Sequence, residues 1–305
     1  MFGFEVVLYL CLGGLGGGLC AVAGIAGLSI PRQFLESVSL SEYSSLMGSS
    51  FVLASASLVL GSLFLLADAG NYSALIHLFI APSFSYLSAG AWFIVVGVGL
   101  CFALVLFWKT ETNGHTVFVS RALHAACALV GVAIALYTGL FLASMKAVPL
   151  WSTFWLPALF VLSSVSCGII FFMALIQSNG KATTFPSFKK RLAKADLLVV
   201  ALELLCAIAL VFGLLMAPID GSTDAAGAAS ALDLISGEGA WVWWGGFVGF
   251  GLIMTTACDV LTLRIEDNWP GRIWSTLGAS FCVLVGAFSL RYCIVMAGVH
   301  PVLGF

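Results

Sequence analysis

The sequence has very little charge. Asp, Glu, Lys and Arg make up only 9% of its 305 residues, against about 25% in an ordinary soluble domain. Hydrophobic residues make up 61% of the chain. So few charges cannot cover a surface that faces water on all sides. The composition therefore excludes a soluble globular protein and indicates a chain that lies mostly within a lipid bilayer.

The sequence also lacks the patterns that hold redox metals. Of its four histidines, only His124 lies in a long apolar run, whereas a haem held by histidines from two helices needs a pair. The nine cysteines all lie in apolar runs, and no two form a CxxC pair, whereas iron–sulfur clusters need grouped cysteines. We expect no haem, no iron–sulfur cluster and no bound metal in this chain, with the cysteines acting as small packing residues.

Nucleic acid is not an expected partner. The net charge is −2, and no basic stretch is interleaved with aromatic residues, as nucleic-acid binding requires.

Long apolar runs recur along the whole chain, and each is long enough to cross a bilayer. They predict helices at 5–29, 46–68, 85–108, 117–142, 153–177, 196–217, 240–263 and 272–297. The first run follows Met1 without a basic flank, which favours a spanning helix over a signal peptide. We expect an all-α integral membrane protein with about eight transmembrane helices in two four-helix bundles. The basic segment 181–194 would link an N-terminal bundle in 1–180 to a C-terminal bundle in 195–305.

The basic residues are distributed unequally between the two ends of these helices. One set of loops and helix ends holds ten of the twelve: Arg32, Lys109, Arg121, Lys181, Lys189, Lys190, Arg191, Lys194, Arg264 and Arg272. The other side holds Lys146 and Arg291. Because basic loops stay in the cytoplasm, we expect both termini and the loops 69–84, 143–152 and 218–239 to face outward.

Ionisable residues inside a membrane are costly and are functional candidates. The predicted outer half contains Glu5, Asp68, His77, Tyr137 and Arg291, and the predicted inner half contains His124, Glu203 and Asp259. The inner group either pairs with Arg121, Lys194 or Arg264 at the helix ends or forms a proton path.

Helix 5–29 contains the run GGLGGG at Gly13 to Gly18. Glycines let neighbouring helices approach closely, which is how helices associate in lipid. The alternative is that a thin helix wall leaves room for a flat ligand.

Several segments resemble a known family. They are VVLYLCLGGLGGG at 6–18, LLADAGNYSALIHLF at 65–79, LSAGAWFIV at 87–95, YTGLFLASMKAVPLWSTFWLPALFVLSSVSCG at 137–168 and LRYCIVMAG at 290–298. Together they resemble the NrfD-like family of polysulfide reductase membrane subunits. The resemblance implies a quinol-oxidising anchor of a molybdenum-enzyme complex in the cytoplasmic membrane of a bacterium or archaeon. It also implies a quinone pocket in the first bundle near the outer face, with menaquinone or ubiquinone as exchangeable substrate. The implied partners are a four-cluster, ferredoxin-like iron–sulfur subunit and a molybdopterin catalytic subunit.

The resemblance also implies roles for single residues. The family motif Asp-Leu-Gly-Arg-Pro corresponds here to Asp68-Ala69-Gly70-Asn71-Tyr72, which keeps the Asp and the Gly but lacks the Arg and the Pro. Asp68 is implied as the proton acceptor, Tyr137 as a hydrogen-bond partner of the quinone, and His77 stands where members often have a His. We expect Glu5 and Arg291, near the same outer helix ends, to line the same quinone site. The alternatives are an Asp68–Arg291 ion pair, an interfacial anchor for Tyr137 and a solvated His77.

Two other functions stay open. A secondary transporter needs broken helices with a site at mid-membrane depth, but Pro157 lies just inside its helix and the other prolines lie in loops, at helix ends or in the tail. A structural anchor without a working quinone site is the second, because the Arg and Pro after Asp68 are missing.

The distribution of basic residues predicts a measurable topology. Reporter fusions after Lys190 should be active as cytoplasmic reporters, and fusions within 221–237 as external ones, because basic loops are retained inside. The reverse pattern would overturn the orientation and, with it, the outer position of Asp68 and Tyr137.

Overall fold

A computed structural model describes residues 3–29, 40–69, 86–110, 117–178, 186–216, 222–264 and 272–298. Within these ranges the chain forms helices and turns and no strand. The helices are α1 (Phe4–Ser29), α3 (Leu40–Ala69), α5 (Tyr86–Thr110), α6 (Val117–Ala143), α7 (Trp155–Ser178), α8 (Pro186–Met216), α9 (Ser222–Ser236), η1 (Val242–Met254), α10 (Thr255–Arg264) and α11 (Arg272–Met296). The segment η1 is π-helical and continues directly into α10.

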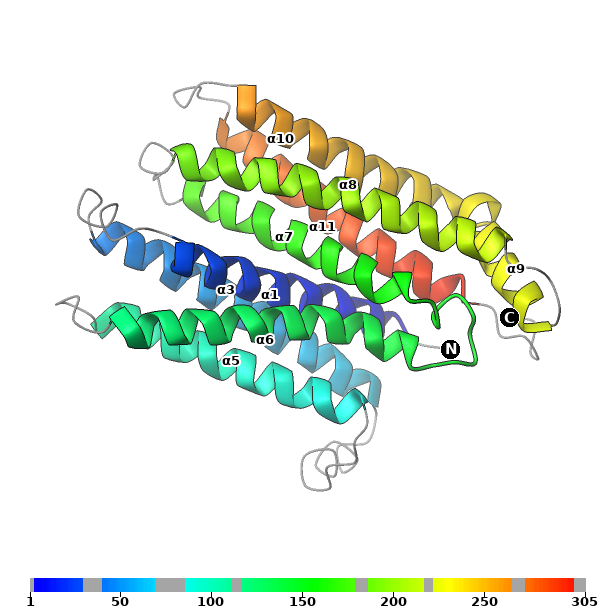
Figure 1. Cartoon of the computed structure of the whole chain (residues 1–305), viewed down its shortest axis with the longest axis horizontal. Coiled ribbons are helices and arrows are strands. Elements are labelled where there is room, and N and C mark those ends of the chain that lie inside the picture. Colours follow the sequence, from blue (N-terminus) through cyan, green and yellow to red (C-terminus); the bar gives the residue numbers. More distant parts are fainter. Residues whose placement is uncertain are drawn as a thin grey trace.

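Eight of the described helical segments are long and apolar enough to cross a membrane, with η1 and α10 counted as one. The predicted all-α, multi-pass membrane protein is therefore confirmed. The long helices run side by side, and the start of α1 and the end of α11 lie at the same end of the molecule (Figure 1). We call this the N-terminal end, and we call the opposite end, which holds Lys109, Arg121 and Arg264, the basic end.

Two helical segments differ from the expectation. Helix α9 lies within 218–239, which was expected to be an outer loop. Its sequence STDAAGAASALDLIS is rich in alanine, the best helix former, and Asp224 in its first turn suits the helix dipole. Residues 186–194 of the expected linker are the first turns of α8, and residues 181–185 lie outside the described residues.

The long helices pack in two groups. We call α1, α3, α5 and α6 the first group and α7, α8, η1–α10 and α11 the second, with α7 lying between the two. Helix α7 contacts α1 and α6 as well as α8 and α11, so the division into bundles of 1–180 and 195–305 stays a prediction. The chain passes from one group to the other through the turns of residues 144–154.

Helix α1 is the central helix, because it contacts α3 and α6 on one side and α7 and α11 on the other. In its most apolar stretch 89% of the residues are buried, against 22% in α8. A Cβ on Gly18 would overlap the carbonyl oxygen of Ser164 in α7, and a Cβ on Gly17 would lie 3.0 Å from the carbonyl oxygen of Gly131 in α6. These glycines therefore bring helix backbones together, and protein atoms fill the space beside them.

Lipid-facing surfaces are recognisable on the remaining helices. Large apolar side chains are exposed on α3, α5, α8, η1, α10 and α11. Exposed tryptophans lie towards both ends, with Trp155 and Trp241 at the N-terminal end and Trp274 at the basic end. Aromatic residues at both ends of the spans are typical of the two membrane interfaces.

The helix contacts of Gly18 can be tested with a matched pair of substitutions. Gly18→Ala should lower the free energy of unfolding by about 1–3 kcal/mol, because its methyl group has no room against α7. Gly99→Ala in α5 meets no atom within 4 Å and should leave stability unchanged or raise it by up to about 1 kcal/mol. The measurement is thermal unfolding of the purified protein in detergent, and equal effects of the two substitutions would contradict the packing of α1.

Candidate functional site

Two buried tyrosines meet near the N-terminal end of the first helix group. The side chains of Tyr9 in α1 and Tyr137 in α6 are 1% and 3% exposed. The two side chains lie within electrostatic range of each other. Neither hydroxyl has a hydrogen-bond partner of good geometry in the part of the chain that the structure describes. The ring of Tyr137 lies over Gly90 of α5, where any Cβ would overlap it. The site therefore presents two O–H donors within a wall formed by three helices.

Two carboxylates lie closer to the N-terminal end than these phenols do. A Cβ on Gly3 would lie 3.0 Å from Oδ1 of Asp68 and would overlap the carboxylate of Glu5. Both acidic side chains are exposed. Glu5 lies one turn before Tyr9 on the same face of α1, a distance of about 6 Å along the helix axis. Asp68, Glu5 and Tyr137 thus lie at one end of the first group, and Tyr9 joins them. His77 lies outside the described residues.

Arg291 has different surroundings. Its side chain is fully buried between α1, α7 and α11, and its Nε donates to the carbonyl oxygen of Leu10 at 3.0 Å. Its Nη1 and Nη2 donate to the hydroxyls of Ser163 and Ser164 at 3.3 and 3.0 Å, and Nη1 also donates to the Ala287 carbonyl at 2.9 Å. These four oxygens, rather than the carboxylate of Asp68, accept the hydrogen bonds of the guanidinium group. The structure therefore does not bring Arg291 together with Asp68 and Tyr137.

A second polar region lies inside the second helix group. Asp196 of α8 is fully buried and faces Asp259 of α10 and Ser166 of α7. Glu203 lies two turns further along α8, faces Ser163 and is within electrostatic range of Arg291. The described part of the chain offers no hydrogen-bond partner to either oxygen of Asp196 or to Oδ2 of Asp259. A row of acidic side chains thus extends from Asp259 towards Arg291.

His124 was expected to lie with Glu203 and Asp259, but the structure separates it from them. His124 lies in α6 of the first group, where its ring packs against Phe51 and Trp108 at centroid distances of 5.7 and 5.8 Å. Its Nδ1 is 2.7 Å from the carbonyl oxygen of Ser120. A carbonyl oxygen only accepts hydrogen bonds, so Nδ1 is the protonated nitrogen. The expected partners Arg121, Lys194 and Arg264 are exposed.

Three residues or groups in these regions were not singled out in the sequence. Tyr9 could have been found by its position one turn after Glu5, and Asp196 by its position two turns before Glu203 on the same face of α8. The third is a group of buried cysteines, Cys20, Cys101 and Cys127, whose Sγ atoms all lie within 4.8 Å of one another. No sequence spacing indicates it, because the three residues belong to three helices.

The fold and these regions define a multi-pass helical membrane protein with polar side chains buried inside both helix groups. The chain belongs to the family described as Polysulphide reductase, NrfD, which matches residues 1–302. It is also similar to Protein NrfD of Escherichia coli (strain K12), with 31% identity over 185 residues. That match covers 59% of this chain and 54% of the relative, so the chain spans about half the length of that protein.

Proposed function

We propose that this protein is the membrane subunit of a respiratory oxidoreductase complex and oxidises quinol at the N-terminal end of its first helix group. The observation that supports the proposal most directly is the pair of buried phenols, Tyr9 and Tyr137, without hydrogen-bond partners in the described chain. Membership of the NrfD family supports it as well, because the resemblance implies a quinone pocket in this part of the chain.

The phenols suit the head group of a quinone. A quinone oxygen has two lone pairs and can accept a hydrogen bond from Tyr9 and one from Tyr137 at the same time. A buried hydroxyl left without a partner costs about 1–3 kcal/mol, so such a ligand would gain binding free energy from both. The aromatic ring of Phe141, whose centroid is 6.2 Å from that of Tyr137, adds an apolar wall.

The carboxylates suit the proton chemistry. Oxidation of a quinol releases two electrons and two protons, and a positioned base speeds the step. Asp68 and Glu5 are exposed at the same end of the group, so either can take a proton and pass it to water. In our proposal this end faces outward, and the electrons pass to the iron–sulfur clusters of a ferredoxin-like partner and then to a molybdopterin subunit. Menaquinol and ubiquinol both fit this chemistry.

The alternative functions predict other features. A secondary transporter would place its site at a broken helix near mid-membrane depth, whereas Pro157 lies in the first turn of α7 and the paired phenols lie near a helix end. A structural anchor would keep the fold and show no dependence of quinol turnover on these side chains.

Removal of either phenol tests the head-group contacts. Tyr9→Phe and Tyr137→Phe should each weaken quinol binding by about 1 kcal/mol, roughly fivefold, because each removes one hydrogen bond. The control is Tyr43→Phe, which changes a phenol that is equally buried but packs against Trp108 at the basic end of α3. The measurement is the quinol affinity of the assembled complex. An equal loss of affinity in Tyr43→Phe would show that Tyr9 and Tyr137 do not form the quinol site.

Asp68→Asn tests the proton acceptor. The amide keeps the shape but cannot take a proton, so quinol turnover per assembled complex should fall by roughly 10²–10⁴-fold while assembly stays intact. Asp233→Asn, at another exposed carboxylate on α9, should have no effect. Normal turnover in Asp68→Asn would exclude Asp68 as the base, leave it a structural residue and favour Glu5.

The row of buried carboxylates favours a second role, proton transfer through the second helix group from the basic end. Asp196 faces Asp259 and lies on the same side of α8 as Glu203. Buried ionisable residues of this kind are typical of proton relays.

Asp196→Asn tests this role without touching the quinol site. In proteoliposomes it should reduce proton transfer coupled to quinol oxidation by about 10²-fold, because the relay loses a group that can be protonated. Quinol oxidation in the presence of an uncoupler should stay normal. If the number of protons transferred per quinol oxidised is unchanged, the row of Asp259, Asp196 and Glu203 has only a structural role.

A further inference from the structure

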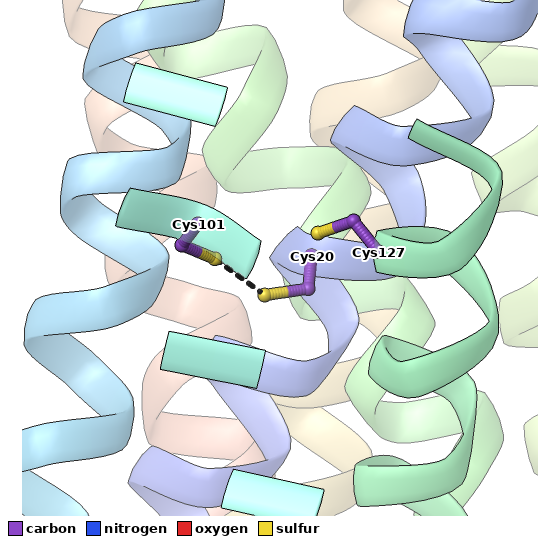
Figure 2. A group of neighbouring side chains, drawn as sticks. All are labelled: Cys20, Cys101 and Cys127. Atoms are coloured by element: carbon purple, nitrogen blue, oxygen red, sulfur yellow. Dashed lines mark hydrogen bonds between the residues drawn. The ribbon is translucent and has the colours of Figure 1, made fainter. Parts of the chain in front are cut away.

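Three buried cysteines from three helices point their sulfur atoms at one another inside the first helix group (Figure 2). Cys20 belongs to α1, Cys101 to α5 and Cys127 to α6, and each is at least nine-tenths shielded from solvent. The Sγ atoms of Cys20 and Cys101 are 3.3 Å apart, and all three Sγ atoms lie within 4.8 Å of one another. In the described chain this is the one place where three side chains able to bind a metal converge in this way.

The surrounding backbone fixes this convergence. A Cβ on Gly131 of α6 would lie 2.5 Å from the backbone nitrogen of Ala21 and 2.9 Å from the Cβ of Cys20. A Cβ on Gly24 would lie 2.7 Å from the backbone nitrogen of Ala128. Close contact between α1 and α6 on both sides of Cys20 therefore holds the side chains of Cys20 and Cys127 together, independently of their sulfur atoms.

The spacing matches a three-coordinate metal site. A metal–thiolate bond is about 2.3 Å long, as for zinc, so three sulfurs around one ion in a plane are separated by about 4.0 Å. The observed 3.3 Å contact widens to this value with a change of less than about 1 Å, within the reach of a small side-chain rotation. Soft thiolate ligands select Cu(I), zinc or iron–sulfur clusters.

The number of donors decides between these ions. Structural zinc sites use four ligands, and catalytic zinc keeps a water as the fourth. The cysteine group offers three donors, all buried, so neither a fourth protein ligand from this group nor bulk water completes a zinc site. Cu(I), which soft thiolate ligands select, does not need a fourth ligand. Its binding releases the three thiol protons, because a cysteine binds a metal ion as the thiolate.

We propose that Cys20, Cys101 and Cys127 bind one Cu(I) ion in a three-coordinate site inside the first helix group. The site is separate from the phenols, because Cys127 lies ten residues before Tyr137 on α6, about 15 Å along the helix. A bound ion would join the central helix α1 to α5 and α6.

The test is copper retention by the full-length protein in detergent. The protein is loaded with Cu(I) under anaerobic conditions with ascorbate and is then dialysed against the Cu(I) chelator bathocuproine disulfonate. Copper per protein should be close to one in the unchanged chain and should fall at least about tenfold in Cys20→Ser, Cys101→Ser and Cys127→Ser, since even changes beside a metal ligand cost about 10–100-fold in affinity. Cys11→Ser is the matched control, because Cys11 is also buried in α1 but lies outside the group.

A second readout covers variants that fold poorly. In the unchanged protein, bound copper should protect these three cysteines, and not Cys11, from alkylation on brief partial unfolding, as mapped by mass spectrometry. Lack of retained copper in the unchanged protein, retention that persists in Cys20→Ser, or an equal loss in Cys11→Ser would overturn the proposal. Retention of zinc in place of copper under the same competition would overturn the assignment to Cu(I).

Discussion

Close backbone contact along α1 is the constraint on which the rest of this structure depends. In lipid no hydrophobic drive brings helices together, so they associate where small residues allow their backbones to approach. Gly18 meets Ser164 of α7 on one side of α1, and Gly17 meets Gly131 of α6 on another. Both helix groups are therefore held against the same helix, which contributes the Tyr9 side chain to one polar region and the Leu10 carbonyl to the other.

Those regions lie on different sides of α1 and suit different chemistry. Tyr9 faces the first group, with the exposed carboxylates of Glu5 and Asp68 nearby. The carbonyl of the next residue, Leu10, holds Arg291 of the second group, whose charge lies within range of Glu203. A guanidinium with four hydrogen bonds to backbone and hydroxyl oxygens is well satisfied in a buried place. In our account, quinol chemistry belongs to the first region and proton transfer to the second.

The membrane spans could be predicted because the length of each apolar run can be counted in the sequence. The rotation of each helix about its own axis cannot be predicted in this way. Arg291 lies near the end of its predicted helix, as Asp68 and Tyr137 do, and this position alone grouped it with them. The rotation of α11 instead turns it towards α1 and α7. Asp196 was overlooked because the expected helix began at that residue, whereas α8 begins at Pro186. The grouping of Cys20 with Cys101 and Cys127 depends on the rotation of three helices at once. Helix α9 was expected to be a loop because it is too short and too polar to span a bilayer.

Photoaffinity labelling of the assembled complex with an azidoquinone tests the central claim most directly, since it reports where the quinone head group binds without any substitution. Peptide mapping should locate the label on the N-terminal turns of α1 around Tyr9 and on α6 around Tyr137, and excess unlabelled quinol should abolish it. Competable labelling confined to α8, α10 or the lipid-facing side of α5, with α1 and α6 unlabelled, would contradict the account.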